Sequence, residues 1–175
     1  FPLHGIENMY IKDCPGDGDC QFHTIANISE LKFVLDNDNK KARNKIVIKQ
    51  KDLRDIVAKY IEDNRDKRDE IVNMFSDFLP INDKIQYNAK VDKMIENVKK
   101  GGFDYQGNHT TLSVLAAKLN SIFIVFQKDI NKSIVVYPIN KNKCEKCVVS
   151  MLYYEPSGDS GHYQLLGLQI KNEKN

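Results

Sequence analysis

Helical and extended sequence patterns occupy separate parts of this chain, and their order restricts the folds that it can adopt. Apolar residues recur at three- and four-residue spacing over residues 49–64, 69–79 and 83–99, which predicts three amphipathic helices. The second of these is expected to end before Pro80. Segments rich in β-branched and aromatic residues begin only after Leu119. Helices followed by strands indicate an α+β fold.

Local signals place the remaining elements. A short helix is predicted to start at or next to Cys20, after 19 residues of short extended or turn segments. Thr110 or Thr111 is expected to cap a helix that ends near Leu119. The strands of a mostly antiparallel sheet are expected at residues 122–126, 133–137, 147–154 and 163–170.

Charge and hydropathy exclude two classes of partner. The chain has 26 Lys and Arg against 24 Asp and Glu, and a net charge of +2 is too small to favour nucleic acid or a membrane surface. Its longest apolar run, residues 121–126, has the length of a strand and falls far short of the roughly 20 residues that span a bilayer. We therefore expect neither nucleic acid nor a membrane as a partner.

Length and cysteine content predict the setting of the protein. Residues 1–175 are expected to form one domain, which we expect to be monomeric. The start at Phe1, without the pattern of a signal peptide, suggests a piece cut from a longer protein. The four cysteines are too few for a disulfide scaffold, which predicts free thiols in a reducing, cytoplasmic setting.

Cys20 is the first candidate for chemistry, because a glycine-containing turn precedes it and a helix follows it. The turn, Asp17-Gly18-Asp19, would bring the thiol to a helix N-terminus, where unpaired backbone amides carry a partial positive charge. Such a position lowers the pKa of a thiol and favours the reactive thiolate. The same amides can bind the oxyanion of a tetrahedral intermediate. The alternative is a small buried cysteine that only packs at the start of the helix.

A nucleophilic cysteine needs a base, and four histidines are available. His4 lies in the N-terminal segment, His23 shares the short helix of the thiol, and His109 precedes a helix, so packing, capping or surface roles are expected for them. His162 follows the small-residue loop at 156–161 and begins a strand, from which it could face a thiol carried by a helix. His162 is therefore the candidate base.

Two short motifs resemble those of the ovarian tumour (OTU) family of cysteine proteases. Residues 17–23, Asp-Gly-Asp-Cys-Gln-Phe-His, resemble the nucleophile motif of the family, and residues 161–164, Gly-His-Tyr-Gln, resemble its histidine motif. Further segments resemble, in the order of the family, its first large helix and its later loop, helix and central strand: residues 53–57, 105–108, 112–116 and 122–125. The resemblance extends from about residue 13 to residue 168.

The resemblance implies a papain-like OTU fold, with helices around a central sheet, and a deubiquitinase that uses no metal and no cofactor. Cys20 would attack the isopeptide carbonyl after the Gly-Gly tail of ubiquitin, and His162 would take and later return the proton. Backbone amides of the loop Asp17, Gly18, Asp19 and Cys20 would form the oxyanion hole. The partner would be ubiquitin or polyubiquitin chains, in the host cytoplasm if the protein is encoded by a virus or pathogen.

The residue that orients His162 departs from the pattern of the family. Many members carry Asp or Asn two residues after the histidine, where this chain has Gln164. The amide oxygen of Gln164 can accept from the imidazole, but it stabilises an imidazolium less than a carboxylate would. Asp17, which matches the Asp that the family carries three residues before the nucleophile, and Asp159 are the alternatives.

Other functions stay open on the sequence. A catalytically weak or inactive module that binds ubiquitin would fit the uncharged Gln164, and a papain-like protease for another ubiquitin-like modifier would share both motifs. Cys144 and Cys147 form a lone Cys-x-x-Cys. We expect a structural hairpin loop there in preference to a zinc or redox site, because zinc needs about four ligands.

Overall fold

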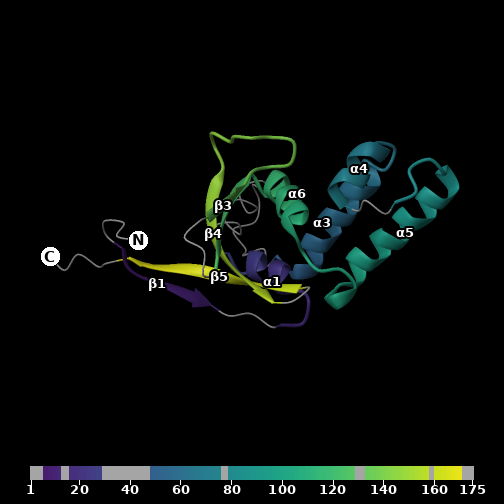
Figure 1. The fold of residues 1–175 in the computed structure, drawn as a ribbon. Helices are drawn as coiled ribbons and strands as arrows, with labels where there is room; N and C mark the ends of the chain where they lie inside the picture. The colour runs from purple at the N-terminus through teal and green to yellow at the C-terminus, as the bar shows by residue number, and fades with distance from the viewer. Residues whose placement is uncertain are drawn as a thin grey trace, which may run out of the picture.

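The structure, a computed structural model, describes residues 6–12, 16–28, 48–75, 79–128, 133–157 and 160–170. Its helices are α1 (Cys20–Ala26), α3 (Gln50–Asp63), α4 (Arg68–Phe75), α5 (Lys84–Lys100) and α6 (His109–Leu119), with a short 3-10 helix, η1 (Gly102–Asp104). Its strands are β1 (Ile6–Lys12), β2 (Ser121–Gln127), β3 (Ser133–Val136), β4 (Val148–Ser157) and β5 (Ser160–Ile170). Figure 1 shows the strands at the left, α3, α4 and α5 at the right, and α1 and α6 between them.

The strands form one mixed sheet in the order β1-β5-β4-β2-β3. Neighbouring strands are antiparallel except β2 and β4, which run parallel from the pair Ser121 and Val148 to the pair Gln127 and Tyr154. β5 lies between β1 and β4, so segments from opposite ends of the chain are neighbours. The predicted α+β class and mostly antiparallel sheet are confirmed.

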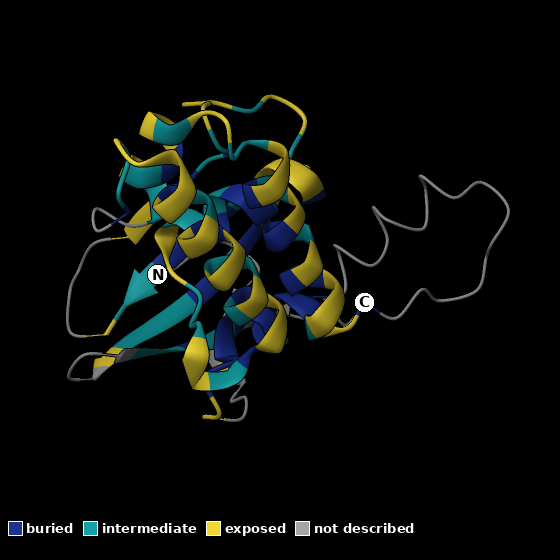
Figure 2. Ribbon diagram, turned by 90° about the vertical axis from the view of Figure 1, so that its right-hand side faces the viewer, coloured by how far each residue is buried: buried dark blue, intermediate teal, exposed yellow. Residues whose placement is uncertain are grey.

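α1 and α6 pack on the sheet, and α3 packs on these two helices through an apolar stripe. α3 contacts α1, α5 and α6, and its residues Leu53, Val57 and Ile61 are fully buried at four-residue spacing. Figure 2 shows the buried sides of the helices turned inward and their exposed sides turned outward. The predicted helices at 49–64 and 83–99 match α3 and α5 closely. α4 is described from Arg68 to Phe75, and residues 76–78, near the end of the predicted helix at 69–79, lie outside the described part of the chain.

Asn108 caps α6, which corrects the expectation that Thr110 or Thr111 does so. The Asn108 side chain accepts the N–H of Thr111 at 3.0 Å, and Thr111 Oγ1 accepts the N–H of Asn108 at 2.8 Å. This reciprocal pair satisfies amides that the first turn of a helix leaves unpaired, and Asn108 can do so because it lies three residues before Thr111. Thr110 has another role, since its hydroxyl donates to Met74 O at 2.7 Å.

Within the described segments, no helix combines the length and the apolar character that crossing a bilayer would require.

Candidate active site

The loop before α1 is shaped by Gly18. Its φ of +86° lies in the left-handed region, and a Cβ there would overlap the carbonyl carbon of Gly102. Asp17 closes the turn, because its Oδ1 accepts the backbone N–H of Asp19 at 3.0 Å. α1 then begins at Cys20, as the sequence predicts. The loop therefore delivers the thiol to the first position of a helix.

The Cys20 sulfur lies at the edge of β5, beside His162. Sγ is 3.8 Å from Gly161 O and accepts the N–H of Tyr163 at 3.4 Å. One turn further along α1, the hydroxyl of Thr24 donates to Tyr163 O at 3.2 Å. Cys20 and Thr24 share a helix face because they are four residues apart. The backbone on both sides of His162 is thereby held against the candidate nucleophile.

α1 can reach this edge because β1 does not cover it. The register of β1 with β5 ends at the pair Lys12 and Leu165. On the other side of β5, His162 pairs with Glu155 of β4, and Gln164 pairs with Tyr153. His162 and Gln164 therefore project from one face of the sheet, since alternate strand residues share a face. Both side chains are half-buried.

Burial changes the chemistry expected of the thiol. Cys20 is 6% exposed, and this desolvation raises the pKa of its thiol above the ordinary value. Backbone amides of Tyr163, Gln21 and Cys20 itself act in the opposite direction, and the charge of Asp17 adds to the rise. The prediction of a lowered pKa is therefore wrong for this structure. A raised pKa means that the thiol holds its proton more strongly, so a reaction as a nucleophile would require a base.

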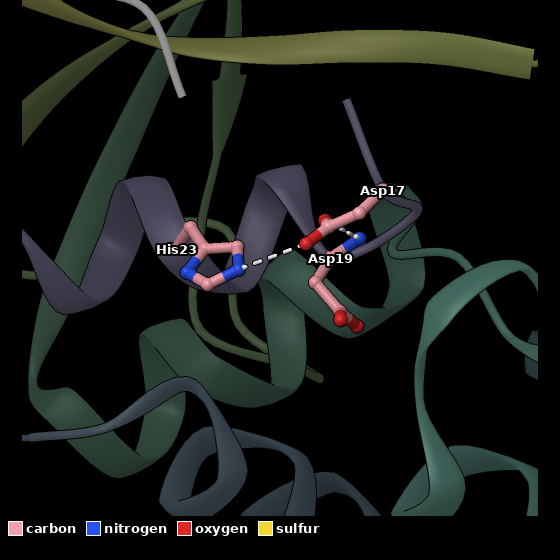
Figure 3. Close-up of side chains that lie close together, drawn as sticks. All are labelled: Asp17, Asp19 and His23. Carbon is pink, nitrogen blue, oxygen red and sulfur yellow. Dashed lines mark hydrogen bonds and ion pairs between the residues drawn. The ribbon is translucent and has the colours of Figure 1, made fainter. Parts of the chain in front are cut away.

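Asp17 lies close to a histidine, but that histidine is His23. Asp17 Oδ2 is 3.5 Å from His23 Nε2, and Figure 3 shows the Asp17 carboxylate turned toward the imidazole while that of Asp19 points away. One possible metal-ligand atom from each of Asp17, Asp19 and His23 lies within 4.8 Å of the other two. The Asp19 carboxylate, however, pairs with Arg54 and accepts the N–H of Gly102, so hydrogen bonds of the loop explain this cluster without a metal. Asp159, the other acid considered for orienting His162, and His4 lie outside the described residues.

Arg54 is a site residue that motif analysis missed. It projects from α3 into the interior, is 1% exposed, and forms an ion pair with Asp19, directly before the nucleophile. The sequence could have indicated that Arg54 is buried, because it lies on the same helix stripe as Val57, Ala58 and Ile61, which are all buried. A charged residue on a buried stripe requires partners.

Gln21, directly after the nucleophile, anchors a second loop. Its Nε2 donates to Asn108 O at 3.0 Å, and its Oε1 accepts from the hydroxyl of Thr111 at 2.5 Å. A Cβ at Gly107 would overlap the Gln21 side chain. Residues 106–108 are therefore packed directly on the start of α1, a contact between distant segments that spacing alone could not reveal.

A cavity of about 520 Å³ is lined in part by Gly161 and Tyr163, the two residues of β5 that contact the Cys20 sulfur. Its lining also includes Phe103, Asn108, Ile134 and Tyr154. The ring centres of Tyr154 and Tyr163 are 4.8 Å apart. Burial raises the pKa of Tyr163 to about 12, so its hydroxyl stays neutral over the physiological range. The cavity and the Cys20 sulfur therefore share Gly161 and Tyr163 as neighbours.

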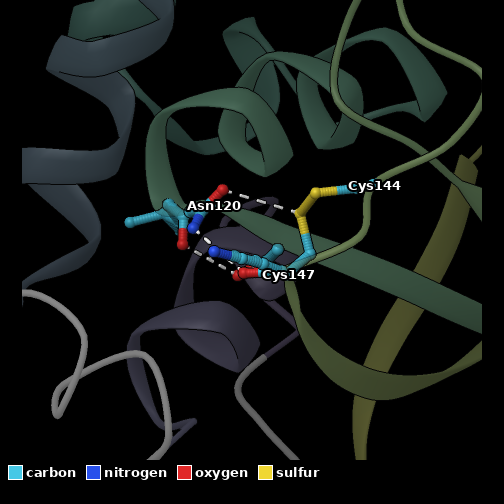
Figure 4. The surroundings of a disulfide bond; sticks show 6 residues. Asn120, Cys144 and Cys147 are labelled. Atoms are coloured by element: carbon cyan, nitrogen blue, oxygen red, sulfur yellow. Dashed lines mark hydrogen bonds between the residues drawn. A yellow bond between two sulfur atoms is a disulfide. The ribbon is translucent and has the colours of Figure 1, made fainter.

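Cys144 and Cys147 form a disulfide, with Cα atoms 5.7 Å apart. The expectation of free thiols is therefore wrong for this pair, because the two-residue spacing brings the sulfurs together in the loop before β4. Asn120 holds the same loop, since its Nδ2 donates to Lys146 O at 3.2 Å (Figure 4). Sulfurs bonded to each other are not zinc ligands. Cys20 is a reduced cysteine outside this disulfide, and Cys14 lies outside the described residues.

Comparison with known proteins gives a match in structure but not in sequence. No protein-family model and no curated protein matches the chain. The OTU domain of OTUD1 matches at a TM-score of 0.56 and 12% identity, over 91% of this chain and 85% of that one. The viral OTU domain protease from Dera Ghazi Khan virus matches at a TM-score of 0.50 and 16% identity, over 92% of this chain and 81% of that one.

A third solved structure, an OTU domain in complex with ubiquitin, matches at a TM-score of 0.49 and 15% identity, over 94% of this chain and 76% of that one. Sequence identities this low speak for the fold alone. The first two matches show that this chain has the fold of OTU domains.

Proposed function

We propose that the protein is a cysteine-type ubiquitin isopeptidase, with Cys20 as nucleophile and His162 as general base. The observation that carries this proposal is the position of the Cys20 sulfur, 3.8 Å from Gly161 O and 3.4 Å from Tyr163 N. The residue between those two contacts is the candidate base. The choice of ubiquitin as substrate rests on the resemblance of the two motifs to those of the OTU family.

In the proposed reaction the thiol sulfur attacks the carbonyl carbon of the last glycine of ubiquitin. His162 accepts the thiol proton, which the raised pKa of Cys20 keeps in place until attack. Amides of residues 17–20 stabilise the oxyanion, and the proton then passes from His162 to the departing lysine amine. Water hydrolyses the remaining thioester with His162 again as base, which frees ubiquitin and restores the thiol.

The arrangement of the loop supports the assignment of the oxyanion site. Gly18 has a positive φ and Asp17 accepts the N–H of Asp19, so the loop is a fixed turn at the start of α1. Gln164 remains our candidate for orienting His162, because both project from the same face of β5. We further propose that residues 1–175 act as one catalytic domain in the cytoplasm.

A ubiquitin that carries a C-terminal electrophile tests the proposal. We expect a covalent adduct with the wild-type protein, seen as a mass increase, and none with Cys20→Ala or after prior alkylation of the thiol. Hydrolysis of di-ubiquitins by the same preparations then tests isopeptidase activity. Binding of ubiquitin without an adduct would identify an inactive binding module. Reaction only with a different ubiquitin-like modifier would move the protein to another substrate class.

A further inference from the structure

Arg54 joins the loop before Cys20 to two segments that lie far along the sequence from it. Its Nη1 donates to Val98 O at 3.1 Å, near the end of α5, and to Tyr105 O at 2.8 Å, in the loop before α6. Its Nη2 pairs with the Asp19 carboxylate and lies 3.5 Å from Gly18 O. The guanidinium is therefore hydrogen-bonded to the loop before the nucleophile and to two segments outside it.

Aromatic packing fixes the plane of this guanidinium. Its central carbon lies 4.2 Å from the centre of the Phe22 ring, and the Phe22 side chain is fully buried in α1. A planar cation stacked on a ring presents its donors in a fixed fork, which a lysine cannot reproduce. Arg54 is thus suited to hold a loop at a set distance and angle.

Asp19 extends the same connection to a second loop. Its Oδ1 also accepts the N–H of Gly102 at 2.8 Å. The backbone of Gly18 packs directly on the backbone of Gly102. Neither residue carries a Cβ, and both have a positive φ. Phe103, the residue after Gly102, lines the same cavity as Gly161 and Tyr163. The Asp19 carboxylate therefore lies between the loop of the nucleophile and a wall of the cavity.

We propose that Arg54 is a positioning residue for catalysis, which acts through Asp19 to fix the turn at residues 17–20. The amides of that turn, other than the Asp19 N–H that Asp17 accepts, then stay directed at the oxyanion. Oxyanion donors contribute only when their geometry is fixed before the reaction, and the loss of one costs about 10²- to 10³-fold in kcat. The side chains of Arg54 and Asp19 do not themselves contact substrate in this proposal. It rests on the proposed hydrolase function of Cys20.

The test uses two variants and two matched controls. Arg54→Lys keeps the charge but removes the fork, and Asp19→Asn keeps an oxygen for the N–H of Gly102 but removes the charge. Arg65→Lys and Asp92→Asn are the controls, because Arg65 and Asp92 form an ion pair between the end of α3 and α5 at the surface. The same chemical changes are thereby made at a pair that has no contact with the loop of the nucleophile.

Three measurements separate positioning from general damage to the fold. We expect Arg54→Lys and Asp19→Asn to lower kcat on a fluorogenic ubiquitin substrate by about 10- to 100-fold. KM and the rate at which iodoacetamide alkylates Cys20 should stay within about threefold, because alkylation forms no oxyanion. Amide hydrogen exchange should become faster in residues 16–22 and stay unchanged in β2. Both controls should match the wild type in every measurement.

Several results would overturn the inference. An equal fall in kcat and in alkylation rate would show loss of folded protein instead of loss of positioning. A kcat like that of the Arg65→Lys control would show that the contact is dispensable. If Arg54→Lys does not fold, Asp19→Asn, which is close in shape to the original, decides alone. If the wild type hydrolyses no ubiquitin substrate, the proposed function fails, and unchanged exchange in residues 16–22 of Asp19→Asn would separately refute the inference.

Discussion

The two halves of the candidate site are held in place in different ways. The nucleophile side, residues 17–24, is fixed by specific polar contacts from α3, from Gly102 and from the edge of β5. The histidine side, residues 161–164, takes its position from the register of β5 with β4, where His162 lies opposite Glu155. Small changes should therefore disturb the geometry of the first half more easily. On the second half, the imidazole itself should matter most.

Removal of the His162 imidazole is expected to have the largest effect on activity, and it tests the difference between the two halves. His162→Ala should lower kcat/KM by about 10³-fold, because general acid–base catalysis contributes about 10²- to 10⁴-fold. The folded structure should be unaffected, since strand register does not depend on this side chain. Steady-state hydrolysis of fluorogenic ubiquitin and thermal melting provide the two measurements. A loss below tenfold would remove His162 as the base.

A methyl group in the loop tests the nucleophile side. Gly18→Ala should lower kcat by about 10- to 100-fold and stability by about 2 kcal/mol, because φ is positive there and the new Cβ would meet the Gly102 backbone. Gly16→Ala is the matched control, since a Cβ at Gly16 would have no atom within 4 Å. Equal behaviour of the two variants in turnover and urea unfolding would show that the loop is not tightly constrained.

The pH dependence of the thiol sharpens the comparison further. Burial raises the pKa of Cys20, so the thiolate fraction at neutral pH should be small and should grow as pH increases. The rate of alkylation by iodoacetamide should therefore continue to rise beyond about pH 8.5, the ordinary thiol value. A plateau reached below pH 7 would instead indicate a thiolate already formed beside an imidazolium, and the histidine side would then act before substrate arrives.

Substitution of Gln164 should have the smallest effect. Gln164→Ala should slow turnover less than about tenfold, much less than His162→Ala, because an uncharged amide stabilises the imidazolium only weakly. Gln164→Asp should raise kcat by placing a carboxylate on the same face of β5. Equal losses in Gln164→Ala and His162→Ala would show that the histidine side depends on its neighbour as strongly as the nucleophile side does.

Local patterns predicted much of the fold. Leu53, Val57 and Ile61 repeat at helical spacing and are all buried, and α1 begins at Cys20 where the turn before it ends. Partners across long sequence distances were harder to predict. The parallel pairing of β2 with β4, and the packing of Gly107 on Gln21, depend on the tertiary arrangement and leave no periodic signal.

The same limit explains the wrong prediction for the thiol. A helix N-terminus lowers a thiol pKa through nearby amides, and this effect could be inferred from residues close to Cys20. Desolvation outweighs it here, and the buried sulfur contacts Gly161 and Tyr163, which lie at the other end of the chain. The ion pair of Arg54 with Asp19 was partly predictable. A charged residue on a buried helix stripe indicates that a partner exists, but the sequence does not show which residue it is.

The position of β5 has a consequence for biosynthesis. A ribosome makes the chain from its N-terminus, so Cys20 emerges long before Tyr163, whose N–H contacts its sulfur in the folded protein. β1 likewise cannot pair until β5, its neighbour in the sheet, has been synthesised. Until β5 is made, Cys20 has neither the backbone contacts that bury it nor the candidate base beside it. Under the proposed function, hydrolytic activity would therefore appear only after β5 has been synthesised.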